Sequence, residues 1–214
     1  MPKRSIIPSV YSFEFGSIRE SLEDILKSKE VDKVHFDGLS DLSAFKDLMW
    51  KYMAIADIHL LSNTPLEELN LLIKMNLPFP IRVSMHVEST EDIKMFSKIA
   101  KDNKMSPGIA IKLKTPVPAD INFYDGFDYV HLICNDNVSG LKSFQDDIFK
   151  KIEVLYKLLG DKCSITLDSG VKEEHIKPAL EKGVSNLVMG SEIFKSENPF
   201  ETVAKFSKLA NSIK

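Results

Sequence analysis

Short apolar runs alternate with amphipathic segments eight times along this 214-residue chain. Most of the runs are rich in Val, Ile or Leu, a composition typical of strands that are buried on both faces of a parallel sheet. The runs cover Ile6 to Val10, Val31 to Asp37, Ala56 to Leu61, Ile81 to Val87, Gly108 to Leu113, Tyr129 to Cys134, Cys163 to Asp168 and Asn186 to Gly190. Eight strand and helix repeats in a chain of this length predict an α/β fold, a (β/α)8 TIM barrel that forms a single domain over residues 1–214.

The segments between the runs are expected to be helices. One apolar stripe with helical spacing consists of Ile148, Ile152, Leu155 and Leu159. The helix after the fifth strand has the least support, because Pro116, Pro118 and Gly126 interrupt that segment. The alternative fold is an open doubly wound sheet, which usually has fewer strands and a Gly-rich turn after the first; no G-x-G-x-x-G occurs in this chain.

Composition excludes several classes of partner. The formal net charge is -3 and no basic block occurs, so we expect no nucleic-acid partner. No apolar run reaches the roughly 18 residues of a membrane helix, and Pro8 interrupts the N-terminal stretch that a signal peptide would need. Cys134 and Cys163 are not spaced as a metal pair, so we expect free thiols and a cytoplasmic protein with no membrane partner.

Polar residues end several of the predicted strands, at the barrel end where active sites form. His35 and Asp37 are two residues apart on one strand and share a face, while His59 and Asp168 lie near the ends of two others. A single strand histidine is more often an ordinary core residue, and we assign His131 to the core or the lower barrel. Two imidazoles and two carboxylates together predict one divalent metal ion, with Zn, Fe, Mn and Co as candidates.

The last two strands end in Asp168-Ser169-Gly170 and Met189-Gly190-Ser191. Phosphate sites of this fold often lie after these strands. Glycine permits close backbone approach, and N–H groups at a following helix start attract anions. The alternative is that the glycines only make tight turns. We expect these loops to bind the phosphate group of a small-molecule ligand.

These motifs resemble the ribulose-phosphate 3-epimerase family, in order along nearly the whole chain. The matching segments are Ile7 to Phe15, Val34 to Asp37, Asp57 to Leu60, Met85 to Thr90, Gly108 to Lys112, Leu167 to Val171, and Gly190 to Phe194 with Asn198-Pro199. The resemblance implies a metal-dependent isomerase of the pentose phosphate pathway that interconverts D-ribulose 5-phosphate and D-xylulose 5-phosphate. It also implies a homo-oligomer.

The resemblance assigns roles to individual residues. His35, Asp37, His59 and Asp168 would hold the metal. Asp37 and Asp168 would also be the acid–base pair, because inverting a stereocentre needs a base on one face and an acid on the other. The substrate would be bound by Ser9, His59, Gly140, Ser169, Gly170, Gly190 and Ser191.

Two segments depart from the family pattern. The segment between Asp37 and His59 is shorter than in the family, and the Gly-rich loop after the sixth strand is replaced by residues 137–141, where only Gly140 remains. These departures leave alternatives open: an allulose-6-phosphate 3-epimerase, another sugar-phosphate isomerase, or a non-catalytic ligand-binding barrel.

Overall fold

The computed structural model describes residues 4–10, 15–89, 92–135 and 144–213. These described residues form eight strands: β1 (Ser5–Pro8), β2 (Lys33–Asp37), β3 (Ile55–Leu60), β4 (Ile81–His86), β5 (Ser106–Ile111), β6 (Tyr129–Ile133), β7 (Ser164–Asp168) and β8 (Asn186–Met189). The helices are α1 (Phe15–Ser28), α2 (Leu39–Tyr52), α3 (Pro65–Lys74), α4 (Ile93–Asp102), α5 (Ile148–Leu159), α6 (Glu173–Glu181), α7 (Ser191–Phe194) and α8 (Pro199–Ser212), with a 3-10 turn at Ile121–Tyr124. Within the described ranges, no helix is long and apolar enough to cross a membrane.

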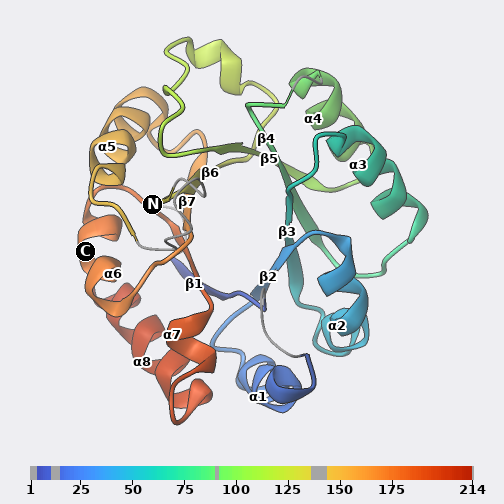
Figure 1. Ribbon diagram of the computed structural model, residues 1–214, viewed down its shortest axis with the longest axis vertical. Helices are drawn as coiled ribbons and strands as arrows, with labels where there is room; N and C mark the ends of the chain where they lie inside the picture. The colour runs from blue at the N-terminus through green and yellow to red at the C-terminus, as the bar shows by residue number, and fades with distance from the viewer. Residues whose placement is uncertain (1–3, 11–14, 90–91, 136–143, 214) are drawn as a thin grey trace.

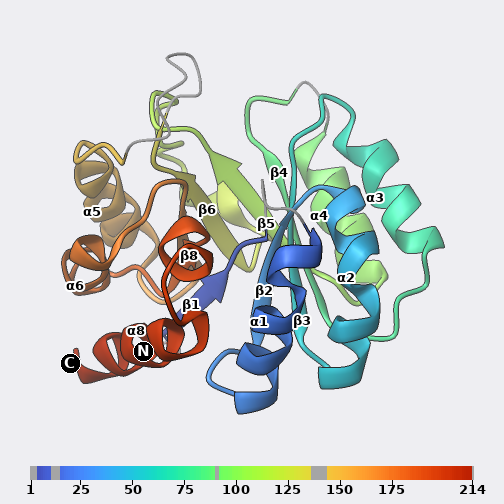
Figure 2. The same ribbon diagram turned by 60° about the horizontal axis from the view of Figure 1, so that its bottom comes forward.

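The strands form one parallel sheet that closes on itself. Their order is β1-β8-β7-β6-β5-β4-β3-β2. A parallel bridge between Ser9 and His35 joins the two outer strands, β1 and β2. Figure 1 looks down the resulting barrel, with the helices around its outside, and Figure 2 shows it turned by 60°. The predicted (β/α)8 barrel is therefore confirmed, and the open doubly wound sheet is excluded.

Local sequence signals account for the helices. The predicted stripe of Ile148, Ile152, Leu155 and Leu159 is buried along α5. The side chain of Asp92 accepts hydrogen bonds from the backbone N–H groups of Lys94 and Met95, which caps the start of α4. Between β5 and β6 a single 3-10 turn stands where the other repeats have an α-helix. This agrees with the prolines and the glycine of that segment.

The fifth strand differs from its predicted bounds. We expected it over Gly108 to Leu113, but β5 covers Ser106–Ile111. Pro107, which the predicted run leaves out, lies inside the strand. Its missing N–H is tolerated because it is near the strand start. The shift leaves Lys112 just beyond the strand, where its backbone N–H donates to the Glu88 carboxylate at 3.1 Å.

A polar layer fills the barrel interior below the carboxyl ends of the strands. Gly108 faces Tyr129 across β5 and β6, and the guanidinium of Arg82 stacks 4.0 Å from the centroid of the Tyr129 ring. An ideal Cβ on Gly108 would lie 2.3 Å from a Tyr129 ring carbon. Glycine at this position is what lets the aromatic ring and the guanidinium share the interior.

We expect the Gly108→Ala variant to lose about 1–3 kcal/mol of unfolding free energy, because the new methyl group forces the buried Tyr129 ring out of its place. Urea denaturation measures the loss. The same substitution in a Tyr129→Leu background should cost less, because the clashing ring is gone. An equal cost in both backgrounds would show that the clash with Tyr129 is not the cause.

Candidate metal centre

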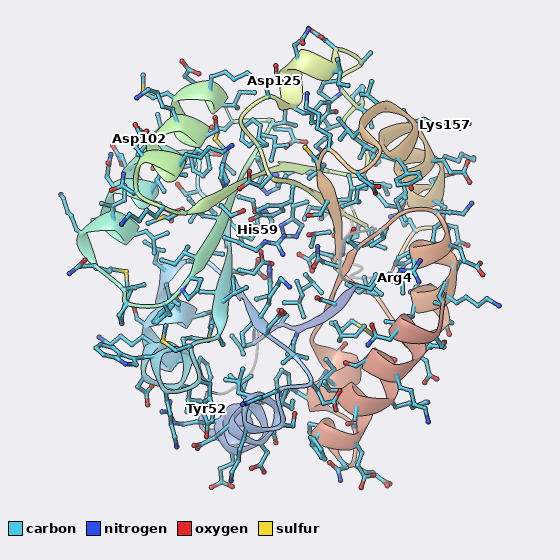
Figure 3. All side chains as sticks on the ribbon, turned by 180° about the vertical axis from the view of Figure 1, so that it is seen from behind. Arg4, Tyr52, His59, Asp102, Asp125 and Lys157 are labelled. Atoms are coloured by element: carbon cyan, nitrogen blue, oxygen red, sulfur yellow. The ribbon has the colours of Figure 1, made fainter. Side chains whose placement is uncertain are left out.

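Four side chains meet inside the barrel near the carboxyl ends of their strands. His35 of β2, His59 of β3, His131 of β6 and Asp168 of β7 each offer one donor atom, and these four atoms lie within 4.8 Å of one another. All four residues are buried. Figure 3 shows His59 near the centre of the barrel, far from the surface helices. No other group of this kind occurs among the described residues.

Two carboxylates, from β2 and β7, lie near the same nitrogen of His35. Asp37 Oδ1 lies 3.5 Å from His35 Nε2 and 3.2 Å from His59 Nδ1. Asp168 Oδ2 lies 3.7 Å from His35 Nε2 and 3.2 Å from His131 Nε2. The four residues predicted as metal ligands therefore converge on one place, and His131 joins them.

A buried ion pair orients His35. Its Nδ1 lies 2.9 Å from Asp57 Oδ2, and Asp57 Oδ1 lies 3.3 Å from Arg82 Nε. A carboxylate only accepts hydrogen bonds, so His35 Nδ1 carries a proton, and in the neutral imidazole the lone pair of Nε2 faces the cluster. Burial raises the pKa of Asp57, but Arg82 and His35 outweigh it and lower the pKa below its ordinary value. This arrangement is typical of metal-binding histidines, which donate their second nitrogen to a carboxylate.

A second chain of hydrogen bonds orients His59. Glu88 Oε2 accepts from His86 Nδ1 at 3.1 Å, which leaves His86 Nε2 as an acceptor. His59 Nε2 lies 2.9 Å from His86 Nε2 and must be the donor of that pair. His59 Nδ1 therefore presents its lone pair to Asp37.

The donor set fits a divalent cation. His35 Nε2 and His59 Nδ1 are buried and form no hydrogen bond of good geometry with any described residue. Both instead face carboxylate oxygens, so lone pairs point at lone pairs. Such an arrangement is unfavourable unless a proton or a metal ion lies between the atoms. Imidazole nitrogens with carboxylate oxygens are ligands that Zn, Fe, Mn and Co accept.

In the metal-free site, a proton on His35 supplies part of the positive charge that a metal ion would bring. Burial alone lowers the pKa of His35, but Asp168, Asp37 and Asp57 raise it well above its ordinary value. Burial raises the pKa of Asp37 and of Asp168, but hydrogen bonds from neighbouring histidines lower both below the ordinary range. Burial lowers the pKa of His59 to about 4. The site thus holds two carboxylates in the charged form in which they bind cations.

A sequence model of the ribulose-phosphate 3-epimerase family matches residues 5–194, most of the chain. The chain belongs to the ribulose-phosphate 3-epimerase family. The resemblance drawn from the motifs is therefore confirmed, and with it the assignment to an isomerase family.

Relatives within the epimerase family align over the whole chain. The ribulose-phosphate 3-epimerase of Buchnera aphidicola is 26% identical over 230 aligned positions, which cover 100% of this chain and 98% of that protein. The ribulose-phosphate 3-epimerase of Schizosaccharomyces pombe is 24% identical over 225 positions, which cover 100% of this chain and 95% of that protein. The crystal structure of 3-hexulose-6-phosphate synthase from Salmonella typhimurium superposes with a TM-score of 0.74 at 14% identity, covering 98% of this chain and 100% of that one. At this identity the structural likeness concerns the barrel fold alone.

The other predicted site residues of this family member lie around the same barrel end. Ser9 is buried and bridged to His35. Ser169 and Gly170 follow Asp168 with positive φ angles of 75° and 77°, so two left-handed residues turn the chain away from β7. Gly190 and Ser191 follow β8 at the start of α7. Gly140 lies outside the described residues.

His131 is the site residue that sequence reasoning missed. We placed it in the core or lower barrel, and it is fully buried, but its Nε2 reaches Asp168. The signal lay in the alternation of β6, where Tyr129 and His131 are polar and Val130 and Leu132 are apolar. In a barrel filled with polar side chains, that alternation aims His131 inward.

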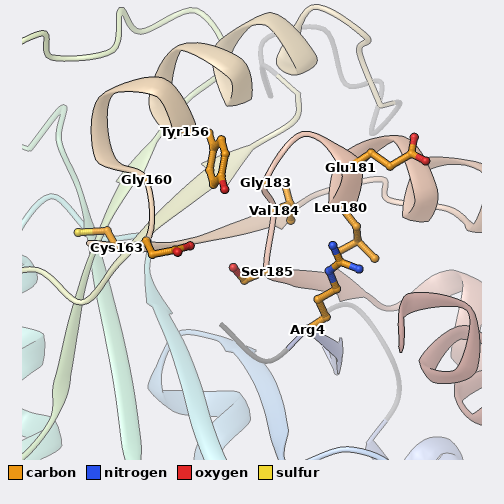
Figure 4. Close-up of a pocket in the computed structure, with 10 residues that line it drawn as sticks. Arg4, Tyr156, Gly160, Cys163, Leu180, Glu181, Gly183, Val184 and Ser185 are labelled. Atoms are coloured by element: carbon orange, nitrogen blue, oxygen red, sulfur yellow. The ribbon is translucent and has the colours of Figure 1, made fainter. Parts of the chain in front are cut away.

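A separate hollow lies at the opposite end of the barrel (Figure 4). Its lining includes Arg4, Cys163 and Ser185, which directly precede β1, β7 and β8. These are the amino ends of the strands, whereas active sites of this fold form at the carboxyl ends. Cys163 there and Cys134 near the metal centre are buried free thiols, and burial raises the pKa of both, so neither is a reactive thiolate.

Proposed function

We propose that this chain is a metal-dependent ketose-phosphate 3-epimerase that interconverts D-ribulose 5-phosphate and D-xylulose 5-phosphate. The observation that carries the proposal is the pair of carboxylates, Asp37 and Asp168, which meet buried imidazoles from β2, β3 and β6. Membership of the epimerase family supports the choice of substrate class. The site suits the transfer of a proton to and from a carbon atom that lies next to a carbonyl group.

Epimerisation at C3 needs two proton carriers on opposite faces of the carbon. Asp37 and Asp168 come from β2 and β7, and both lie near His35 Nε2, so in this proposal the substrate carbon would be held between these two carboxyl groups. The aspartate in its carboxylate form removes the C3 proton, and the other, which must first take up a proton, acts as the carboxylic acid that protonates the opposite face. A bound divalent metal would supply positive charge against the negative charge that develops on the substrate oxygens. His35, Asp37, His59 and Asp168 would hold that metal, with Zn, Fe, Mn and Co as candidates.

In this proposal, the loops after β7 and β8 bind the phosphate of the substrate. Ser169 and Gly170 have left-handed backbone conformations there, and Gly190 and Ser191 begin α7. Phosphate sites of the barrel fold are commonly built from these two loops. Ser9, beside His35, and His59 would contact the sugar.

A coupled assay tests the proposal directly. Purified protein is loaded with Zn, Mn, Co or Fe(II) and given D-ribulose 5-phosphate, and formation of D-xylulose 5-phosphate is followed through a coupling enzyme. We expect turnover that a chelator abolishes and added metal restores. Activity on allulose 6-phosphate alone would reassign the substrate. Binding of both sugar phosphates without turnover of either would favour a non-catalytic ligand-binding barrel.

Metal binding should release about one proton near neutral pH, because metal ligands must be deprotonated. The pKa of His35 lies well above its ordinary value, so the metal-free site holds a proton there that the metal displaces. The pKa of His59 is about 4, so that residue releases none. Metal affinity should therefore fall as the pH falls. Calorimetry in buffers of different ionisation enthalpy counts the protons, and affinity independent of pH between 6 and 8 would contradict this charge assignment.

A further inference from the structure

His131 has a place in the cluster that the four predicted ligands leave unexplained. Its side chain is fully buried, and its ring centroid lies 5.3 Å from that of His35 and 4.6 Å from that of His59. Its Nε2 lies 3.2 Å from Asp168 Oδ2. The His131 ring therefore lies closer to the rings of His35 and His59 than those two rings, 6.2 Å apart, lie to each other.

The second ring nitrogen of His131 has a partner of its own. Nδ1 lies 3.2 Å from Ser84 Oγ. The Ser84 hydroxyl also lies 3.5 Å from the Ile58 carbonyl oxygen, to which it donates its single hydrogen. Ser84 Oγ can then accept a hydrogen bond from His131 Nδ1–H, which leaves the Nε2 lone pair directed at Asp168. His131 thus shows the same pattern as His35, with one nitrogen anchored and the other turned to the centre.

The distances allow one ion to be shared. The donor atoms of His35, His59, His131 and Asp168 lie within 4.8 Å of one another. Ligands about 2.0–2.2 Å from a metal ion lie at most about 4.4 Å apart across it, so small side-chain adjustments bring all four into contact. Asp37 lies beside this group, with its Oδ1 3.5 Å from His35 Nε2 and 3.2 Å from His59 Nδ1.

We infer that His131 Nε2 is a ligand of the metal, so that the centre contains three imidazoles together with Asp168 and Asp37. This inference rests on the proposed function and concerns the same site. A third nitrogen donor favours ions that prefer imidazole, such as Zn and Co, over Mn and Mg, which prefer oxygen. The ligand His131 therefore sets which ion the site selects.

X-ray absorption at the Zn edge counts imidazole ligands in the substrate-free protein. We expect three imidazoles in the wild type and two in His131→Gln. Competition with a chromophoric chelator should give a Zn dissociation constant about 100-fold or more higher in the variant, as loss of a ligand costs at least as much as loss of its supporting contacts. The dissociation constant for Mn should rise less. His175→Gln is the matched control, since His175 stacks on Phe144 at the start of α6, and it should leave both values unchanged.

The outcomes separate this inference from the proposed function. Two imidazoles in the wild type, or an unchanged Zn dissociation constant in His131→Gln, would overturn the role of His131 and leave a metal-dependent epimerase intact. No metal binding by the wild type would overturn the proposed function as well. If His131→Gln does not fold, the imidazole count of the wild type decides alone.

Discussion

Asp37→Asn and Asp168→Asn are each expected to lower the rate of C3 epimerisation by about 10³-fold or more. The substitution keeps the shape of the side chain but removes the group that takes up and returns the proton, and general acid–base groups typically contribute 10²–10⁴-fold. Each variant also loses an anionic oxygen that faces the imidazoles. Steady-state kinetics with saturating metal measures the effect on kcat.

Asp102→Asn is the matched control for these variants. Asp102 is an exposed residue of α4, paired with Lys98, and lies on the outer surface (Figure 3). It should retain wild-type kcat, because surface pairs of this kind contribute little. Measuring bound metal in every preparation separates loss of the ion from loss of the proton carrier. Activity retained in either Asp37→Asn or Asp168→Asn would remove the two-carboxylate mechanism.

Arg82→Ala is expected to cost about 3–5 kcal/mol of unfolding free energy, the range for breaking a buried ion pair. Arg82 and Asp57 are both buried, with side-chain exposures of 10% and 1%, and Arg82 also donates to Thr166 Oγ1 at 3.0 Å. Removing the guanidinium leaves the Asp57 carboxylate with His35 as its remaining polar partner in the described contacts. Urea denaturation at neutral pH measures the loss.

The pH dependence of that loss follows from Asp57. Its pKa is lowered in the folded protein, so its contribution to stability is present above the unfolded value of about 3.9 and is lost as the pH falls below it. The cost of Arg82→Ala should therefore shrink in acid. Arg19→Ala removes an exposed ion pair with Asp47, whose side chains are 38% and 62% exposed, and should cost no more than about 1 kcal/mol. Equal losses in the two variants would contradict a buried pair at Arg82.

The fold was predictable because every repeat carries its own local signal. Apolar runs mark the strands, the Ile148 stripe marks α5, and Pro116 and Pro118 mark the repeat without an α-helix. The bounds of β5 were wrong because the strand begins at Ser106 and includes Pro107, whose pairing with Val83 of β4 depends on the register between the two strands.

The site was only partly predictable, because it depends on register between distant strands. His35 and Asp37 share a face by spacing alone, but His131 reaches Asp168 only because β6 and β7 pair Ile133 with Asp168. The roles of the site residues stay proposals, as do the homo-oligomer and the cytoplasmic location.

Proton exchange at C3 tests the central claim most directly. D-ribulose 5-phosphate is incubated in heavy water with metal-loaded protein, and deuterium at C3 is followed by nuclear magnetic resonance and mass spectrometry. We predict that both epimers acquire one deuterium at C3, that a chelator stops the exchange, and that restored metal recovers it. Metal-loaded, folded protein that leaves C3 unlabelled while still binding the sugar phosphate would contradict the claim that this barrel is an epimerase.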